Sequence, residues 1–374
     1  MVGGPLNGGL APQRGSGVTG GVIQLVQRLI PGGIETLALE LSTRVSGENR
    51  VLSLEWSNAQ IIANWPAMAQ APCPIEGLQK MPGFRPEFVL TLARRLRALR
   101  PRAVVAHHIG PLVYGGVAAR LAGVPRFIYV EHDVWHYEKA GDERLASAAA
   151  FITRPRVVAV SDSVARTVRR IMPSCKVEVI RNAVDTERFR PGDRQAARAA
   201  LGLPQDARII GAAGRLEHIK GQDVLVAAMA QVPDALLVLV GQGSRAQALA
   251  EQAQVLGIGE RVHFLGQRDD MPEVYPAFDI VCLPSRNEGL PLSVLEAQAC
   301  GLPVVATDVG SVREGLCPGI GAIVPPEAPD AMATALRTVL AMPAAGNPRD
   351  FVLRTFSWER LVADYEGLLG PQRP

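Results

Sequence analysis

The sequence predicts an α/β protein with two doubly wound domains, each built on a parallel sheet. Short apolar runs rich in β-branched residues, which are typical of buried strands, alternate with longer segments of helical periodicity. Turns containing glycine or proline separate the two kinds of segment. A length of 374 residues is enough for two hydrophobic cores. Repeated strand–helix–strand units of this size favour parallel sheets covered by helices.

The first half of the chain begins with a predicted strand at residues 22–26. The strand leads through Gly32 and Gly33 into a predicted helix from residue 34 to about residue 45. A strand, a glycine turn and a helix form the unit with which doubly wound folds approach phosphate, although such a turn often marks only tight packing. Further strands are predicted at 51–54, 103–106, 127–131, 157–160 and 176–180, and further helices at 87–100, 112–122 and after Ser161.

Histidines stand at the predicted carboxyl ends of two of these strands. His107 and His108 follow one strand, and His132 follows another. Ligands of parallel α/β sheets bind beyond the carboxyl ends of strands, so the position favours a functional histidine. A histidine at a strand end is also often only a hydrogen-bonded structural residue. Asp133 could orient the ring of His132 or cap a helix.

The predicted helix at 87–100 is amphipathic and basic. Its apolar residues form one stripe, and arginines gather near its end: Arg94, Arg95, Arg97, Arg100 and Arg102. These arginines could face anionic lipid. The favoured interpretation is that they are solvated and complement the negative end of the helix dipole.

The second half predicts another strand–helix series after a boundary near residue 190. Strands are predicted at 208–213, 236–240, 262–266, 278–283 and 304–307, and helices at 291–300, 327–341 and in the last segment, 356–369. Pro291 suits the first turn of its helix, and Gly301 suits the end. The start of this helix offers unpaired backbone N–H groups and the positive end of the helix dipole, which favour phosphate.

Two carboxylates flank this predicted anion site. Glu288 precedes the helix and Glu296 lies in its second turn. Carboxylates can accept hydrogen bonds from sugar hydroxyls when they lie beside a phosphate. The pair therefore suits a nucleotide diphosphate sugar. Either glutamate taken alone could instead be a surface residue or one that favours the helix dipole.

Two cations complement the glutamates. Arg215 and Lys220 occupy the connection after the strand at 208–213, within G-R-L-E-H-I-K-G. They could hold a diphosphate from the side opposite the helix start. Either one alone could be a solvated surface cation. As negative charge grows on the leaving nucleoside diphosphate, such cations would stabilise the transition state.

The stretch 285–310, S-R-N-E-G-L-P-L-S-V-L-E-A-Q-A-C-G-L-P-V-V-A-T-D-V-G, resembles the donor-site signature of glycosyltransferase family 4. The resemblance extends through most of the chain. It includes G-G-I-E at 32–35, Y-V-E-H-D-V-W at 129–135 and the linker R-N-A-V-D-T-E-R-F-R-P at 181–191, in which Ala183 replaces the commoner glycine. The family implies the GT-B architecture, with two Rossmann-like domains facing across a cleft and a C-terminal helix returning to the first domain.

The resemblance implies a domain layout and roles for particular residues. It makes residues 21–190, with the returning 357–374, an acceptor-side domain and residues 191–356 a donor domain. Residues 1–20 hold seven glycines and no apolar core segment, so we expect a flexible leader there. Glu288 and His132 would act at the transferred sugar. Gly33 would approach the donor phosphates, and Arg268 would line the base pocket beside 262–266. The remaining donor-binding residues would be Arg215, Lys220, Gly289, Leu290, Pro291, Leu292 and Glu296.

The implied reaction is retaining, metal-independent glycosyl transfer from a nucleotide diphosphate sugar, with no further cofactor. Asp269 and Asp270 are adjacent and stand beside the base pocket, where a metal would not assist the leaving group. The family places Glu288 on the hydroxyl side of the sugar, which implies same-face displacement rather than a covalent intermediate. A nucleotide-sugar epimerase of the same architecture is the alternative. A catalytically silent glycan-binding relative is also possible, and a dinucleotide oxidoreductase lacks its glycine fingerprint.

The amino-acid composition limits the binding partners and the cellular compartment that we expect for this protein. Residues 1–190 carry 24 Lys and Arg against 15 Asp and Glu, a net +9, and residues 191–374 carry 15 against 21, a net −6. An aromatic content of 5% and the absence of interleaved aromatic and basic residues argue against nucleic acid. The five spaced cysteines suggest reduced, structural thiols. With no predicted membrane span, we expect a cytoplasmic enzyme that acts on a glycan or lipid-linked acceptor in surface polysaccharide assembly, with possible peripheral contact at the inner face of the membrane.

Overall fold

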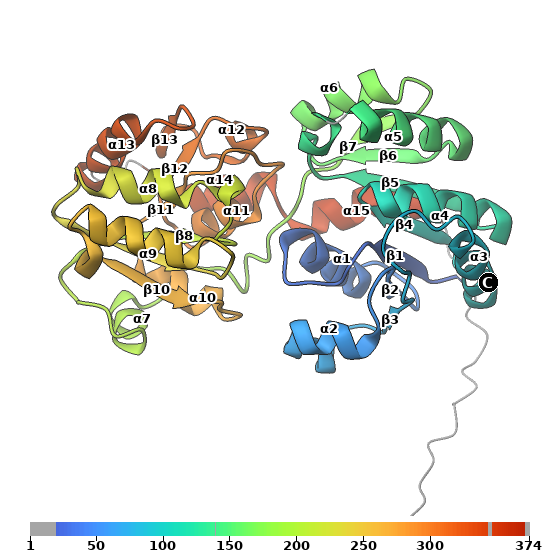
Figure 1. Ribbon diagram of the computed structural model, residues 1–374, viewed down its shortest axis with the longest axis horizontal. Coiled ribbons are helices and arrows are strands. Elements are labelled where there is room, and N and C mark those ends of the chain that lie inside the picture. The colour runs from blue at the N-terminus through green and yellow to red at the C-terminus, as the bar shows by residue number, and fades with distance from the viewer. Residues whose placement is uncertain (1–19, 139, 343–345, 371–374) are drawn as a thin grey trace, which may run out of the picture.

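The computed structural model describes residues 20–138, 140–342 and 346–370. The predicted leader lies outside these residues except for Gly20. The chain forms two sheets of parallel strands, one in each half, and helices cover their faces (Figure 1). The predicted α/β class with two Rossmann-like sheets is therefore confirmed.

The first sheet has seven strands in the order β3-β2-β1-β4-β5-β6-β7. Their bounds are β1 (Val22–Val26), β2 (Arg50–Ser53), β3 (Ile75–Gly77), β4 (Ala103–His107), β5 (Arg126–Glu131), β6 (Arg156–Ala159) and β7 (Val177–Val179). The connecting helical segments are α1 (Gly33–Arg44), α2 (Asn58–Asn64), η1 (Pro66–Gln70), α3 (Phe88–Leu99), α4 (Ile109–Ala122), η2 (Trp135–Glu138), α5 (Ala140–Thr153) and α6 (Asp162–Ile171).

The second sheet has six strands in the order β10-β9-β8-β11-β12-β13. They are β8 (Arg208–Ala213), β9 (Ala235–Val240), β10 (Val262–Gly266), β11 (Ile280–Leu283), β12 (Val304–Thr307) and β13 (Gly321–Val324). The helical segments of this half are α7 (Arg194–Ala200), η3 (His218–Lys220), α8 (Gln222–Met229), α9 (Ala246–Val255), η4 (Gly259–Arg261), α10 (Met271–Val274), η5 (Tyr275–Ala277), α11 (Leu292–Ala299), α12 (Val312–Gly315), α13 (Pro329–Ala341) and α14 (Pro348–Thr355).

The last helix, α15 (Trp358–Leu369), lies against the first sheet's half of the molecule, as Figure 1 shows in red. Glu366 pairs with Arg102 at 3.1 Å, and the Arg44 guanidinium lies 4.8 Å from the centre of the Trp358 ring. Burial drives this return, because the apolar side chains of one face of α15 are at most 7% exposed: Trp358, Leu361, Tyr365, Leu368 and Leu369.

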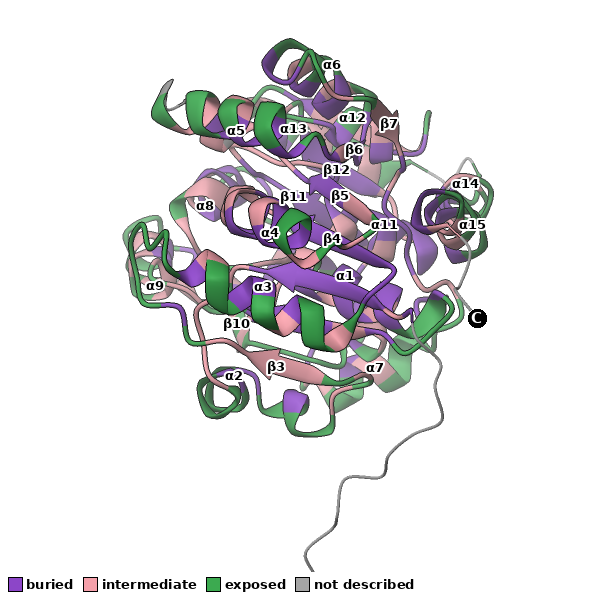
Figure 2. Cartoon of the chain, turned by 90° about the vertical axis from the view of Figure 1, so that its right-hand side faces the viewer, coloured by how far each residue is buried: buried purple, intermediate pink, exposed green. Residues whose placement is uncertain are grey.

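The central strands form the buried core of each half, the edge strand β3 is half-buried, and the helices show an exposed outer stripe (Figure 2). On α3, Leu92 and Leu96 are fully buried while Leu90 on the opposite side is 54% exposed. This alternation is the pattern expected of a helix that packs on one face of a sheet. One hydrophobic cluster is continuous across the two halves and contains both Val105 of β4 and Leu295 of α11.

Several element boundaries differ from the sequence-based expectations. α11 begins at Leu292 because Pro291 is its extended N-cap residue, with ψ 120°. α4 begins at Ile109, three residues early, because His108 at φ 72° turns the chain and Pro111 fits the first turn. The elements that the sequence did not predict are α2, η1, β3, α5, α7, α8, α9, β13 and α14, together with the short helical segments η2, η3, η4, α10, η5 and α12.

The predicted boundary near residue 190 falls between β7 and β8, the last strand of one sheet and the first of the other. None of the five cysteines forms a disulfide, and Cys282, Cys300 and Cys317 are buried. Among the described residues, no helix combines the length and the apolar character needed to cross a bilayer.

Candidate active site at the junction of the two halves

The loop between β11 and α11 holds Glu288 beside a cation. The Lys220 ammonium donates to Oε1 of Glu288 at 2.7 Å, and the Ser285 hydroxyl donates to the same oxygen, also at 2.7 Å. Ser285 is only 1% exposed, and its carbonyl accepts a hydrogen bond from Thr307. Glu288 is therefore fixed from two sides, with Lys220 beside the loop that leads into α11.

The connection after β8 places Arg215 near Lys220. The Gln222 amide donates to the Arg215 carbonyl at 2.9 Å, and the Arg286 N–H donates to the Ile219 carbonyl at 2.8 Å. The first bond ties the connection to the start of α8, and the second joins it to the loop before α11. The Arg215 side chain is exposed, and its positive charge acts on Glu35 in the other half of the molecule.

The start of α11 lies directly against residues of the first sheet. A Cβ added to Gly289 would lie 1.8 Å from the carbonyl oxygen of His132, and one added to Gly33 would lie 3.2 Å from Cδ1 of Leu292. Glycine is required at 289 because only the absence of a side chain permits this approach. The structure therefore brings together four residues that the sequence singled out from separate halves of the chain.

Further hydrogen bonds fix the loop before α11. The Gly289 carbonyl accepts from the Ser311 N–H at 3.1 Å, and the Leu290 carbonyl accepts from the Asn182 side chain at 3.2 Å. Asn182 belongs to the linker between the sheets. Leu290 and Pro291 are buried, so their backbone shapes the site more than their side chains do.

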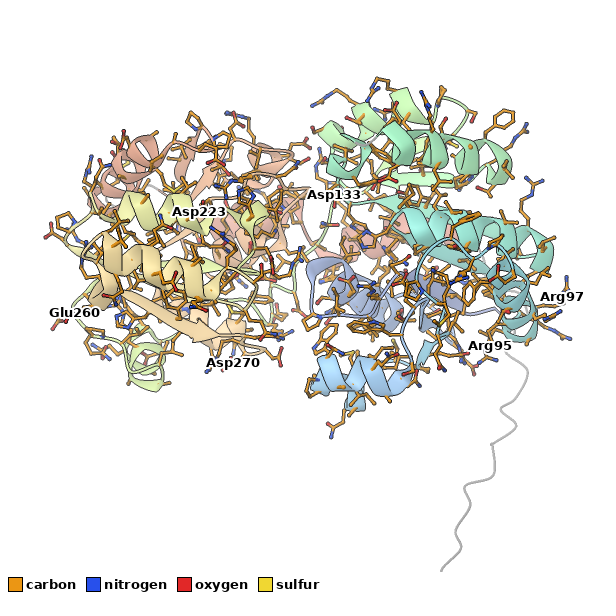
Figure 3. All side chains as sticks on the ribbon, in the orientation of Figure 1. Arg95, Arg97, Asp133, Asp223, Glu260 and Asp270 are labelled. Atoms are coloured by element: carbon orange, nitrogen blue, oxygen red, sulfur yellow. The ribbon has the colours of Figure 1, made fainter. Side chains whose placement is uncertain are left out.

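His132 is buried at the end of β5, and its imidazole is held by another histidine. Nε2 of His132 lies 2.9 Å from Nδ1 of His107. Burial lowers the pKa of His132 well below its ordinary value, so the ring is neutral at physiological pH. Asp133 does not orient this ring. Its carboxylate lies 3.2 Å from Nδ1 of His136 instead. Asp133 stands at the junction of the two halves, whereas Arg95 and Arg97 lie at the far side of the first (Figure 3).

Glu35 is a functional candidate that the sequence analysis did not select. It follows Gly33 in the first turn of α1, is 7% exposed and lies 3.9 Å from Nε2 of His108. Burial raises its pKa to about 7, and the charge of Arg215 opposes this rise. The glutamate of G-G-I-E was a signal that could have identified it, because a carboxylate after a glycine turn faces the same site as the glycine.

Glu296 and Arg268 stand further from this junction. The Tyr275 hydroxyl donates to Oε2 of Glu296 at 2.8 Å, and burial raises the pKa of this glutamate. Arg268 is exposed and pairs with Asp270 at 2.5 Å. An indirect link joins this segment to Glu296, because Arg188 donates to the neighbouring Asp269 carbonyl at 3.0 Å and the charge of Arg188 acts on Glu296.

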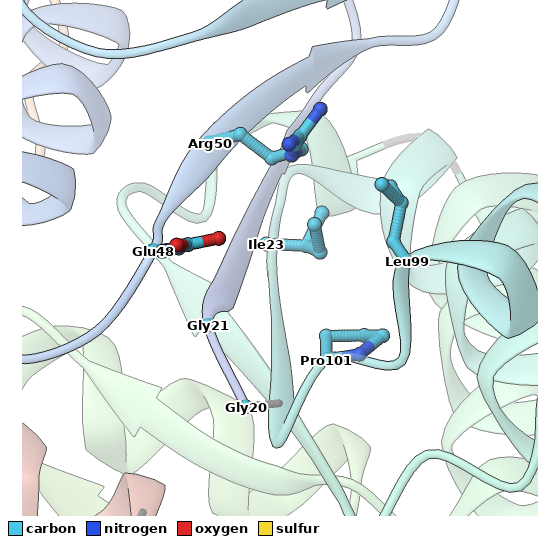
Figure 4. A pocket seen from close by; sticks show the side chains of 7 residues that line it. All are labelled: Gly20, Gly21, Ile23, Glu48, Arg50, Leu99 and Pro101. Atoms are coloured by element: carbon cyan, nitrogen blue, oxygen red, sulfur yellow. The ribbon is translucent and has the colours of Figure 1, made fainter. Parts of the chain in front are cut away.

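Within the residues that the structure describes, neither the other cavity nor the distribution of metal-binding side chains offers a site at these strand ends. A pocket of about 50 Å³, lined among others by Gly21, Glu48 and Pro101, lies at the amino end of β1, opposite the end that carries the histidines (Figure 4). In the described part of the chain, no three His, Cys, Asp or Glu side chains gather as metal ligands would. The junction at the carboxyl ends of the strands is thus the candidate active site.

Sequence comparisons match both halves of the chain. Residues 31–188 match the family described as Glycosyltransferase Family 4, and residues 193–352 match the family described as Glycosyl transferases group 1. A D-inositol 3-phosphate glycosyltransferase from Mycolicibacterium gilvum is 44% identical over 197 residues, which are 50% of this chain and 45% of that protein. The match therefore spans about half the length of this curated relative.

Solved structures with similar folds cover almost the whole chain. HepE from Anabaena, in complex with UDP and glucose, superposes with a TM-score of 0.82 at 23% identity, covering 93% of this chain and 99% of that one. Sucrose-phosphate synthase from Thermosynechococcus elongatus gives a TM-score of 0.77 at 24% identity, covering 93% and 98%. At this level of identity, the likeness concerns the fold.

Proposed function

The chain belongs to glycosyltransferase family 4, and from this premise we propose that it transfers a hexose from a nucleotide diphosphate sugar to a hydroxyl group of a glycan or lipid-linked acceptor. Transfer proceeds with retention of anomeric configuration and without a metal ion. Residues 191–356 bind the donor, and residues 21–190 with the returning α15 receive the acceptor. The transfer takes place in the cytoplasm, as a step in the assembly of a surface polysaccharide or glycoconjugate.

One observation carries the proposal: the N-terminal end of α11 contacts His132 and Gly33 of the first half, and Lys220 pairs with Glu288 in the loop that leads into this helix. Lys220 and Glu288 pair at 2.7 Å beside Gly289, and Gly289 itself packs on His132. A diphosphate at the start of α11 would receive backbone N–H groups there and the charges of Arg215 and Lys220. The sugar attached to it would then lie between Glu288 and His132.

Each remaining residue has a role in this arrangement. Glu296 accepts hydrogen bonds from the ribose hydroxyls, while the segment of β10 and Arg268 contact the base. Leu290, Pro291 and Leu292 supply the backbone at the phosphate, and Gly33 lets the first half approach it. Lys220 has three donors, so it can keep Glu288 oriented toward the sugar hydroxyls while it also contacts phosphate.

The reaction exchanges two bonds at the anomeric carbon. The bond from this carbon to the phosphate oxygen breaks, and the bond to the acceptor oxygen forms on the same face of the sugar. The acceptor proton passes to the departing phosphate oxygen, and Arg215 and Lys220 stabilise the charge that develops there. The contact of Gly289 with His132 excludes water from the sugar, so that hydrolysis does not compete.

The alternative of a nucleotide-sugar epimerase is not favoured, because both halves match glycosyltransferase families. Peripheral membrane contact stays a prediction. On α3, Arg94, Arg97 and Arg100 are exposed, whereas Arg95 pairs with Glu76 at 2.6 Å. Cosedimentation with vesicles containing anionic lipid, compared with neutral vesicles, tests it.

Thermal-shift measurements with UDP-, GDP- and ADP-glucose test the proposed function, with NAD as a control. We expect one nucleotide sugar to raise the melting temperature and to be the donor in transfer assays with added saccharide acceptors. The anomeric configuration of the product, read by NMR, tests retention. Stabilisation by NAD and by none of the nucleotide sugars would overturn the proposal.

A further inference from the structure

A buried chain of polar side chains runs from the core of the first sheet to His132. Gln24 lies on β1, His107 ends β4 and His132 follows β5, and these three strands are neighbours in the sheet. Oε1 of Gln24 lies 2.8 Å from Nε2 of His107, and Nδ1 of His107 lies 2.9 Å from Nε2 of His132. Gln24 and His107 are 0% exposed, and His132 is 6% exposed.

The proton positions in this chain follow from its hydrogen bonds. Both rings are neutral, because burial lowers the pKa of His107 to about 3 and that of His132 well below its ordinary value. A neutral imidazole has one N–H and one lone pair. Since Oε1 of Gln24 can only accept, His107 donates from Nε2 and must accept at Nδ1. The hydrogen between the two histidines therefore belongs to Nε2 of His132.

The remaining nitrogen of His132, Nδ1, then carries a lone pair. Nδ1 is the ring nitrogen nearer to the backbone, and the His132 backbone packs against Gly289 at the start of the candidate donor site. No hydrogen bond to Nδ1 is found in the described part of the molecule. A lone pair at this place can accept a hydrogen bond from a sugar or acceptor hydroxyl, whereas an N–H could not.

We propose that Gln24 and His107 are positioning residues that fix the tautomer of His132, so that Nδ1 accepts a hydrogen bond from a reacting hydroxyl. This inference deepens the proposed function and rests on it. Neither residue touches the substrates. They act through the ring of His132, in the way that partners of a catalytic histidine generally select its tautomer.

NMR of the ligand-free protein labelled with ¹⁵N at histidine tests the tautomer without any enzyme assay. The chain has six histidines, so single substitutions assign every ring. We expect His132 in the wild type to be protonated at Nε2 alone. His107→Phe, which keeps a ring but has no nitrogen, should leave His132 as a mixture of tautomers. A wild-type His132 protonated at Nδ1, or an unchanged spectrum in the variant, would overturn the proposal.

Steady-state kinetics of sugar transfer, from the nucleotide sugar that the thermal shift selects to a saccharide acceptor, provide the second readout. We expect His107→Phe to lower kcat on the order of 10²-fold, the effect of misplacing a group that contacts the reacting hydroxyl, with little change in KM. Gln24→Met should lower kcat in the same direction, and Gln24→Glu, which keeps the acceptor oxygen, should restore part of it. An equal loss in Gln24→Met and Gln24→Glu would contradict the mechanism.

Tyr129→Phe is the matched control for simple destabilisation. Tyr129 lies on β5, is fully buried, and donates a hydrogen bond to Glu131 at 2.6 Å. This variant should lose stability while keeping both the His132 spectrum and kcat. If the protein transfers no sugar at all, the kinetic readout fails together with the proposed function, but the tautomer spectrum still decides whether Gln24 and His107 fix the ring.

Discussion

At the scale of single residues, the carboxylates around the junction differ in the groups that donate hydrogen bonds to them. Glu288 faces the Lys220 ammonium at 2.7 Å, while Glu296 receives the Tyr275 hydroxyl at 2.8 Å and Glu131 receives the hydroxyls of Tyr129 and Tyr137. Burial raises the pKa of Glu296 and that of Glu131, and the tyrosine hydroxyls that donate to these two carboxylates oppose the rise. The ion pair of Glu288 with Lys220 suits a site that binds a charged ligand. The buried hydrogen bonds from Tyr129 and Tyr137 to Glu131 suit a structural role.

Glu296→Ala should weaken donor binding on the order of 10-fold, because the loss of one or two ribose hydrogen bonds corresponds to about 1.4 kcal/mol. Isothermal titration with the donor selected by thermal shift measures this change. Glu251→Ala on α9, where the glutamate is exposed, is the control and should bind as the wild type does. Equal affinity of the Glu296 variant and the wild type would remove Glu296 from the site.

His132→Ala should behave differently from Glu296→Ala. The ring lies in the first half of the molecule, while the proposed donor contacts belong to the second. We therefore expect donor affinity within about 2-fold of wild type, less than 0.5 kcal/mol, and turnover lowered by at least 10²-fold. Titration and steady-state transfer assays separate the two effects. Wild-type turnover in the variant would refute a catalytic role for His132.

The buried carboxyl of Glu131 should make the free energy of unfolding depend on pH. Burial raises its pKa from 4.5 to about 7, so the folded protein holds this proton more tightly than the unfolded chain. Its contribution to stability is therefore complete below about pH 4.5 and is lost as the pH rises through 7. Glu131→Gln removes the titrating group. The free energy of unfolding of the wild type should fall relative to that of the variant between pH 4.5 and 8 by about 3 kcal/mol.

Urea unfolding at several pH values measures this difference. Glu359→Gln, an exposed position in the first turn of α15, provides the control and should follow the wild type at every pH. Parallel curves for wild type and Glu131→Gln would show that the carboxyl of Glu131 titrates at its ordinary pKa in the folded protein.

At the scale of elements, the start of α6 joins the two halves. Ser161 caps α6 by accepting from the Val164 N–H at 3.0 Å, and Glu314 of α12 accepts from the N–H groups of Asp162 and Ser163 at 3.0 and 2.9 Å. A carboxylate at a helix N-terminus is favoured by the unpaired N–H groups and the dipole. A glutamate from one half therefore completes the cap of a helix in the other.

Glu314→Ala should lower the free energy of unfolding by about 1 kcal/mol, the usual effect of losing a cap. It should also speed hydrogen exchange at the amides of Asp162 and Ser163, because these groups lose their acceptor. Glu314→Gln retains one carboxamide oxygen and should lie between the wild type and the alanine variant. Unchanged exchange at both amides in Glu314→Ala would mean that the two halves do not hold this contact in solution.

The elements that sequence could predict are those whose own periodicity decides their structure. The strand before Ser285, the helix containing Glu296 and the returning segment around Trp358 all bury a recognisable apolar face. β3 is a short edge strand of three half-buried residues, Ile75–Gly77, so it carries no comparable pattern. The first turns of α4 and α11 depended on the backbone at His108 and Pro291, which periodicity does not reveal.

At the scale of the whole molecule, contacts between residues distant in sequence could not be read from local patterns. Gln24, His107 and His132 become neighbours only because β1, β4 and β5 are adjacent in the sheet. His107 was noted at a strand end, but its partners required the strand order. Lys220 and Glu288 were expected in one site from their motifs, whereas the approach of Gly289 to His132 depends on how the two halves dock.

The contact between the two halves can be tested by replacing three glycines with alanine. Gly289→Ala would place a methyl group 1.8 Å from the His132 carbonyl, a backbone atom that cannot move aside, so the two halves must separate. Gly33→Ala would place one 3.2 Å from the flexible end of Leu292, where a small shift suffices. Gly367→Ala on α15 meets nothing within 4 Å and should be neutral or stabilising by about 0.5–1 kcal/mol.

Transfer activity should therefore fall in a graded series. We expect little change in Gly367→Ala and a modest loss in Gly33→Ala. The loss in Gly289→Ala should be on the order of 10²-fold, because misplacing reacting groups by an ångström has effects of this size. UDP binding should fall far less, because Arg215 and Lys220 remain together in the second half. Small-angle X-ray scattering should show a larger radius of gyration for Gly289→Ala alone. If Gly289→Ala keeps the wild-type dimensions and turnover, the closed contact between Gly289 and His132 is not the reacting arrangement, and the acceptor must reach the sugar by another approach.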